Sequence, residues 1–411
     1  MGKLTVVLQR NERLVELEAV RGIAACVVLV HHCLLGFAPT LHGLVGPTRP
    51  WSLFGTPLFA FVNGSAAVVV FFVLSGFVLT YRAIESKDTA LLWLGAAKRW
   101  PRLAVLIITV NVLAAQIAVM QFYWNIPASS ENGSIWLSWF YRAPSPYSSS
   151  QILGAIYEGG VGTFLFGQAY FNSNLWTMYY EFFGSLLVFG LAYLFLKVRA
   201  SYFVIVAGAV AATTIYFSPY FLCFVTGIAL AIIRYGLPIS EKLLPGRHWK
   251  TSLTISAIIL AILLFGYHEH IGDSASMRFY GFLSPIAALN PIGFRVVLHT
   301  IGAVIVLVLA LKFPDCLRTN LAALIGRLSF STYLLHIPLI CSIGSCLYLF
   351  LLPVWGEIPT AATTILVTIT ATFAAAFPLS LLDRFWLVAL RRFQILITNQ
   401  FGMIFQKGLG H

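Results

Sequence analysis

Charged residues are scarce in this sequence. Only 10% of its 411 residues are Asp, Glu, Lys or Arg, and just 14 of them are acidic, whereas soluble domains carry about 25% charged residues. Hydrophobic residues make up 59% of the chain, and no long polar block interrupts the apolar runs between residues 19 and 382. The composition excludes an ordinary soluble protein. It predicts one all-α, polytopic transmembrane domain over residues 1–411, with no appended soluble domain.

Metal-binding and disulfide patterns are also missing. The six cysteines have neither the spacing of zinc ligands nor the pattern of a secreted domain, and most lie in apolar runs, where Cys acts as a small hydrophobic residue. His268, Glu269 and His270 form a His-x-His triplet, which alone is weak evidence for a metal. We therefore predict no metal site. The amino terminus is too charged for a cleavable signal, so the first apolar run should remain as a signal anchor.

The chain contains about ten apolar segments that are long enough to cross a membrane, at about 20 residues each. A further stretch, residues 152–171, is apolar but broken by glycines, and we expect it to lie in the interface or to re-enter rather than to span. The predicted helices cover residues 19–37, 62–83, 103–122, 175–196, 201–217, 219–235, 251–267, 292–311, 330–352 and 361–382.

The basic residues predict how these helices are oriented. A formal net charge of +12 could indicate nucleic-acid binding. However, an even number of spans places 22 of the 26 Lys and Arg residues on the side of the two termini. Lys and Arg concentrate in the cytoplasmic loops of membrane proteins. We therefore predict that both termini are cytoplasmic and that the protein binds membrane lipid and no nucleic acid.

Two ionisable residues stand out in the first predicted helix. Arg21 and His32 are eleven residues apart, which is about 16 Å along a helix and only about 20° around its axis. His31 is about 80° away from Arg21. Arg21 could hold an anion at the cytoplasmic end of this face while His32 transfers protons near the membrane centre. The alternative is a buried histidine bound to a backbone carbonyl, with an arginine that snorkels to the interface.

Five segments together are similar to a known family. LEAVRGIAACVVLVHH resembles the opening motif of the acyltransferase family 3 membrane proteins, in which ten residues separate an Arg from a His. Arg21 and His32 fit that spacing, and His31 does not. Glu18 and Phe330 replace the family's usual Asp and Tyr. The other four segments follow in the family's order and extend the resemblance over residues 17–339: VFFVLSGFVLTYR (70–82), KRWPR (98–102), NLWTMYYEFFGSLL (174–187) and GRLSFSTYLLHIPL (326–339).

The resemblance implies a cytoplasmic acyl-coenzyme A donor, with acetyl-coenzyme A as the expected one. Its phosphates would be held by basic residues that could otherwise be mere markers of the cytoplasmic side. Ser75 with Gly76 could also be an ordinary close-packing site. The residues expected to bind the donor are Arg21, Arg82, Arg99 and Arg102. The residues expected to contact substrate are Ser75, Trp176, Tyr333 and His336, although His336 could instead orient a neighbouring helix.

The implied reaction is O-acylation by general-base catalysis. His32 would activate the acceptor hydroxyl, and Glu181 would orient the imidazole or the acceptor. A transient acyl-His intermediate is the alternative. The acceptor implied by the resemblance is a sugar hydroxyl of a cell-surface glycan or its lipid-linked precursor, which places the protein in the plasma membrane. Lipophilic secondary metabolites are alternative acceptors, and a secondary transporter is an alternative from another functional class.

Overall fold

The computed structural model describes residues 14–45, 49–139, 150–237, 251–269 and 278–408. Within these residues all regular secondary structure is helical, as predicted. The ten long helices are α1 (Val15–Phe37), α3 (Gly64–Ser86), α4 (Ala90–Val119), α9 (Trp176–Lys197), α10 (Ala200–Phe217), α11 (Pro219–Ala231), α13 (Thr251–Gly266), α15 (Pro291–Lys312), α16 (Asn320–Leu339) and α18 (Glu357–Gly408).

Shorter helical segments connect or extend the long ones. They are α2 (Pro39–His42), η1 (Pro57–Val62), α5 (Asn125–Asn132), α6 (Ile135–Trp139), α7 (Ser150–Tyr157), η2 (Glu158–Gly162), α8 (Thr163–Phe166), η3 (Ser173–Leu175), η4 (Ile232–Gly236), η6 (Arg278–Leu283), α14 (Ser284–Ala287), η7 (Pro314–Cys316), η8 (Ile340–Gly344) and α17 (Ser345–Trp355).

The predicted number of spans agrees with the structure. In the described part of the chain, nine helices are long and apolar enough to cross a membrane, and the shorter apolar α13 occupies the position of the remaining prediction. Two boundaries were predicted too late. α4 begins at Ala90 rather than 103, and the helical run predicted to start at 330 begins at Asn320. Both extensions are mostly apolar but contain basic residues, Lys98, Arg99 and Arg102 in the first and Arg327 in the second, which hydropathy places outside a span although the helix continues through them.

The glycine-broken stretch at residues 152–171 forms α7, the π-helical η2 and α8, and it makes no spanning helix. α7 and η2 pack against α4. A Cβ added to Gly159 would lie 2.8 Å from Ile108 Cα of α4, closer than side chains pack. The glycines therefore break the apolar run and let it lie directly against a neighbouring helix.

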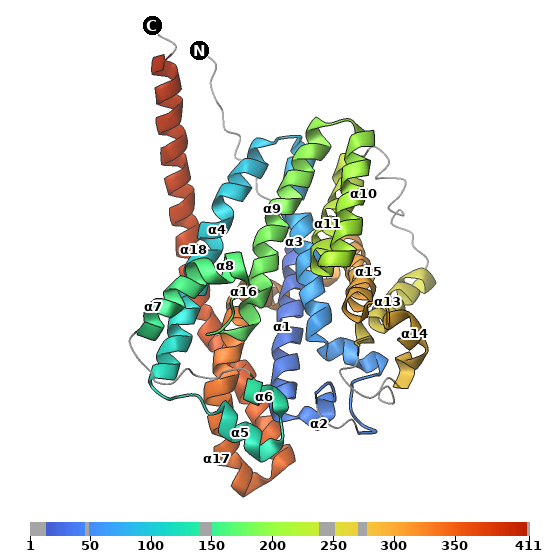
Figure 1. Cartoon of the computed structure of the whole chain (residues 1–411), viewed down its shortest axis with the longest axis vertical. Helices are drawn as coiled ribbons and strands as arrows, with labels where there is room; N and C mark the ends of the chain where they lie inside the picture. Colours follow the sequence, from blue (N-terminus) through green and yellow to red (C-terminus); the bar gives the residue numbers. More distant parts are fainter. Residues whose placement is uncertain (1–13, 46–48, 140–149, 238–250, 270–277, 409–411) are drawn as a thin grey trace.

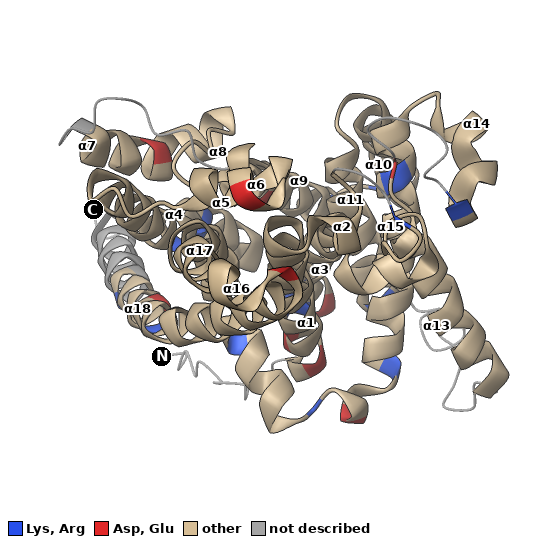
Figure 2. Cartoon of the chain, turned by 90° about the horizontal axis from the view of Figure 1, so that it is seen from below, with Lys and Arg blue, Asp and Glu red and all other residues tan. Residues whose placement is uncertain are grey.

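α1 lies at the centre of the bundle, in contact with α3, α15, α16 and α18 (Figure 2). Its backbone comes closest to α16. A Cβ on Gly22 would lie 2.6 Å from Gly326 N, and a Cβ on Gly326 would lie 2.6 Å from Glu18 O. Only glycines allow these two backbones to meet so closely. The polar residues of α1 are thereby placed against those of α16.

The bundle has two distinct ends (Figure 1). α1 begins and α18 finishes at what we call the upper end, and α2, α5, α6 and α17 lie at the opposite, lower end. α1 and α18 therefore run antiparallel. Because α1 runs downward, Arg21 lies toward the upper end and His32 toward the lower end.

Candidate functional site

A large cavity opens between α1, α3, α4, α9, α16 and α18, with a volume of about 770 Å³. Its wall includes the first turn of α1, the last turns of α3 and the first turns of α4, so it lies toward the upper end. A narrower cavity of about 120 Å³ shares part of this wall and reaches further between the helices. The shared residues are Arg21, Ser75, Arg99, Arg102, Glu181, Arg327 and Asp383.

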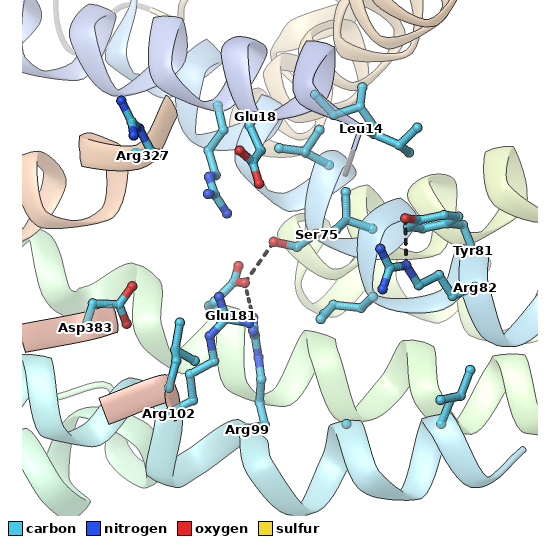
Figure 3. Close-up of a pocket in the computed structure, with 18 of the residues that line it drawn as sticks. Leu14, Glu18, Ser75, Tyr81, Arg82, Arg99, Arg102, Glu181, Arg327 and Asp383 are labelled. Atoms are coloured by element: carbon cyan, nitrogen blue, oxygen red, sulfur yellow. Dashed lines mark hydrogen bonds and ion pairs between the residues drawn. The ribbon is translucent and has the colours of Figure 1, made fainter. Parts of the chain in front are cut away.

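The wall of the large cavity is strongly basic. It carries seven arginines and only three carboxylates, which are Glu18, Glu181 and Asp383 (Figure 3). Guanidinium groups in a partly enclosed site bind phosphate oxygens in pairs. The arginines are Arg21, Arg82, Arg99, Arg102, Arg327, Arg384 and Arg391.

Glu181 joins three helices at the bottom of this cavity. Its carboxylate on α9 accepts a 2.8 Å hydrogen bond from Ser75 Oγ on α3 and forms an ion pair with Arg99 on α4. The hydrogen-bond and ion-pair partners of Glu181 are thus Ser75 and Arg99, and its role in orienting the imidazole or the acceptor stays a prediction. Arg99 is buried, and its Nε has no hydrogen-bond partner within the described residues. The guanidinium can thus accept a further anionic partner.

Arg21 connects the cavity to α16. Its Nε donates to Ser329 Oγ at 3.1 Å, and that hydroxyl donates to Gly326 O at 2.8 Å. Arg21 and Ser329 both line the narrow cavity. The close approach of Gly22 to Gly326 places the two side chains together. Arg82, by contrast, is exposed at the mouth, where its Nε donates to Tyr81 OH at 2.9 Å.

The narrow cavity is mostly apolar at its inner end. Phe71, Phe72 and Met178 line it, together with the hydroxyls of Thr177 and Tyr333. Tyr333 OH lies 2.8 Å from Thr177 Oγ1 and 3.0 Å from the carbonyl oxygen of Asn174, to which it donates. This end can hold an uncharged, flexible chain.

Trp176 was predicted to contact substrate but lines neither cavity. Its ring packs against Tyr180 and Tyr220, with centroids 5.8 and 5.3 Å away. Ser75 and Tyr333 do line the narrow cavity. The structure therefore brings two of the four predicted substrate residues to a cavity wall, and it places His336 elsewhere.

His336 on α16 meets His32 on α1. The two rings join through His32 Nδ1 and His336 Nε2 at 2.9 Å, and Trp136 of α6 packs nearly parallel to the His32 ring at 5.1 Å. His31 faces elsewhere, toward the Val62 carbonyl and His42. Arg21 and His32 thus both face α16. However, His32 lines neither cavity formed by the described residues.

The inner end of the narrow cavity lies close to the His32–His336 pair along α16. Tyr333 lines the inner end of the narrow cavity and lies one helical turn before His336. The carbonyl oxygen of Tyr333 also accepts a hydrogen bond from His336 Nδ1 at 2.7 Å. Tyr333 is therefore the side chain that a molecule in the narrow cavity would meet before it reached His32.

The His-x-His triplet has a different role. Glu269 Oε1 pairs with Arg295 Nη1 at 2.6 Å, and the same nitrogen lies 2.9 Å from His268 Nε2. Burial, followed by the Arg295 charge, lowers the pKa of His268, and burial raises the pKa of Glu269 against the effect of Arg295. His270 lies outside the described residues. No group of three metal-ligating side chains occurs in the part of the chain that the structure describes.

Several cavity residues were not predicted from the sequence. The sequence predicts no binding role for four residues that line the large cavity, which are Arg327, Asp383, Arg384 and Arg391. The three arginines share only their positive charge, which is weak evidence for a binding site because any cytoplasmic loop is basic. α18 brings Asp383, Arg384 and Arg391 to α4, where Trp386 Nε1 donates to the Pro101 carbonyl at 2.8 Å.

A family model described as an acyltransferase domain matches residues 14–377. The chain belongs to acyltransferase family 3. No curated relative and no solved structure matches it. Family 3 membership and the apolar helices together make the protein an integral, multi-pass membrane acyltransferase. The family match includes both cavities except for the part contributed by the middle of α18, since Ser380, Asp383, Arg384, Leu387 and Arg391 follow residue 377.

Proposed function

We propose that this family 3 protein transfers an acyl group, with acetyl as the expected one, from cytoplasmic acyl-coenzyme A to a hydroxyl. The acceptor is a sugar of a cell-surface glycan or of its lipid-linked precursor, and the membrane is the plasma membrane. The observation that carries the proposal is the arginine-lined cavity of about 770 Å³, which is large enough and basic enough for a nucleotide with several phosphates.

The donor fits the two cavities in a defined order. Its phosphates bind the arginines of the large cavity, including buried Arg99, whose Nε lacks a partner in the described structure. Its uncharged pantetheine arm extends into the narrow cavity between Phe71, Phe72 and Met178. The cavity opens toward the upper end. The concentration of Lys and Arg on the side of the termini supports a cytoplasmic position for that end.

The chemistry requires the thioester to pass Tyr333 and reach His32. His32 then removes the proton from the acceptor hydroxyl as the new C–O bond forms at the thioester carbon. The C–S bond breaks, and the coenzyme A thiolate takes the proton from the imidazolium. In the acyl-His alternative the acyl group is carried on a His32 nitrogen between the two transfers. The acceptor would approach from the lower end, where His32 and Trp136 lie.

Purified protein in lipid nanodiscs provides the test. Coenzyme A should raise the melting temperature, because a ligand that binds only the folded protein stabilises it. Acetyl-coenzyme A should release free thiol slowly with water as the acceptor and faster with a suitable glycan. The absence of both stabilisation and thiol release would contradict the proposal. Solute uptake by the protein reconstituted in liposomes, without thiol release, would indicate a transporter.

A further inference from the structure

His336 is a completely buried residue held at both ring nitrogens. Its Nδ1 lies 2.7 Å from the Tyr333 carbonyl oxygen, and its Nε2 lies 2.9 Å from His32 Nδ1. A carbonyl oxygen can only accept a hydrogen bond, so His336 Nδ1 carries a proton. No carboxylate contacts this ring within the described residues, and a buried charge without a partner is costly. His336 is therefore neutral, and its Nε2 can only accept.

That acceptor acts on the neighbouring ring of His32, which also has a hydrogen bond with the Val28 backbone. Because His336 Nε2 accepts, the proton between the two rings belongs to His32 Nδ1. In neutral His32 the unprotonated nitrogen is then Nε2. The order runs in one direction, from the Tyr333 carbonyl through His336 to His32.

One neighbouring contact tests this assignment. Asn174 Nδ2 lies 3.5 Å from His336 Nδ1 and would make that nitrogen an acceptor. The same amide also donates to the Tyr333 carbonyl. If His336 Nδ1 were unprotonated, its lone pair would face the Tyr333 oxygen at 2.7 Å, which is repulsive. The short carbonyl contact outweighs one at the limit of hydrogen bonding.

The rings are also held in place by packing. The His32 and His336 centroids are 4.9 Å apart with planes 25° apart, and Trp136 makes the same 25° angle with the His32 ring. Gly22 and Gly326, which let α1 and α16 meet, fix the distance between the two helices. His336 is thus placed to control the ring of His32 rather than to contact the substrate from the cavities.

We propose that His336 is a positioning residue that holds His32 in the tautomer with Nδ1 protonated and Nε2 unprotonated. The proposal rests on the proposed function, in which Nε2 receives the proton of the acceptor hydroxyl. After that transfer, Nδ1–H still donates to His336, so the same hydrogen bond stabilises the imidazolium. A neutral histidine acceptor here does for His32 what a backbone or carboxylate acceptor does for many catalytic histidines.

The tautomer can be measured without any enzyme assay. In ¹⁵N-histidine-labelled protein in nanodiscs, His32→Ala identifies the His32 signals by their loss. The nitrogen shifts of the wild type should show Nδ1 protonated and Nε2 unprotonated. His336→Leu should shift His32 toward the opposite tautomer or a mixture, whereas His336→Gln, whose amide oxygen can accept, should preserve it in part. His299→Leu is the matched control, because His299 on α15 is equally buried and its Nε2 lies 2.8 Å from the Tyr267 carbonyl oxygen.

The kinetic arm separates this proposal from the proposed function. His336→Leu should lower kcat by about 10- to 100-fold with little change in KM for acyl-coenzyme A, and His336→Gln should recover part of the loss. A wild-type His32 protonated at Nε2, or a His32 tautomer unchanged in His336→Leu, would overturn the proposal even if the enzyme is active. Absence of transferase activity with the expected tautomer would instead overturn the proposed function. If His336→Leu fails to fold, the His32 tautomer in the wild type and in His336→Gln still tests the proposal.

Discussion

Ser75 Oγ donates a 2.8 Å hydrogen bond to Glu181 Oε1, and this contact joins α3 to α9 at the bottom of the basic cavity. The carboxylate also pairs with Arg99 of α4. A carboxylate inside a membrane span needs such partners, because an isolated charge there is costly. The contacts of Glu181 with Ser75 and Arg99 therefore hold α9 against α3 and α4. They also set the local charge that an incoming phosphate meets.

Removal of Glu181 should destabilise the protein. Glu181→Ala leaves buried Arg99 without its carboxylate, and breaking one side of a buried pair costs about 3–5 kcal/mol. Ser75→Ala removes only a neutral donor and should cost about 1 kcal/mol. Thermal unfolding followed by tryptophan fluorescence measures both variants in the same lipid. Equal effects of the two substitutions would show that the ion pair contributes little to folding.

Arg391 offers a test of the donor site that the sequence could not have supplied. Arg391 and its neighbour Arg392 are both exposed, but only Arg391 lines the large cavity. Loss of one solvent-screened contact of up to about 1 kcal/mol should raise KM for acyl-coenzyme A by up to about 5-fold in Arg391→Ala. The acceptor KM should change little. Arg392→Ala is the matched control, and a similar rise in both variants would mean that only general surface charge matters.

Arg21 should depend on its shape as well as its charge. Arg21→Ala should remove a charge-assisted contact of about 1.5–3 kcal/mol and raise the donor KM by about 10- to 150-fold. Arg21→Lys should recover only part of the loss, since an ammonium lacks the planar fork that binds two phosphate oxygens. Raised salt should partly imitate the Ala variant by screening. Steady-state kinetics at two salt concentrations measure this. A normal donor KM with reduced protein abundance would assign Arg21 to folding, through Ser329.

His32 and His31 should behave differently although they are adjacent. His32→Ala should abolish acyl transfer, because it removes the proposed base. His31→Ala should leave a folded enzyme with substantial activity, since His31 contacts the Val62 carbonyl and His42 rather than His336. The measurement is the activity per mole of protein, and gel filtration checks that both variants are monodisperse. Equal loss in both variants would contradict the separation of the two faces of α1.

The orientation of the bundle can be tested with exposed serines at its two ends. Ser130 lies in α5 and Ser86 at the end of α3. In a Cys316→Ser background, which removes the exposed native cysteine, an impermeant thiol reagent should label Ser130→Cys from outside the cell and leave Ser86→Cys unlabelled until the membrane is opened. The reverse pattern would place the basic cavity outside, where coenzyme A is not available.

The sequence by itself determined the helical membrane architecture, because a bilayer leaves so few ways to satisfy the backbone. Apolar runs of about 20 residues located the spans, and the motif around Arg21 and His32 identified the family, which the match over residues 14–377 confirms. Helical phase alone separated His32 from His31. These features are local, since each depends on the spacing of residues within one helix.

Only the tertiary structure decided which residues from different helices meet. Glu181 bonds Ser75 and Arg99, and His336 bonds His32, and neither set of partners could be read from the sequence. Arg391 had no signal beyond its charge until α18 brought it to the cavity. In a span almost every residue is apolar, so the side of a helix that faces a partner leaves little trace in hydropathy. The contacts are set instead by close backbone approaches such as that of Gly22 and Gly326.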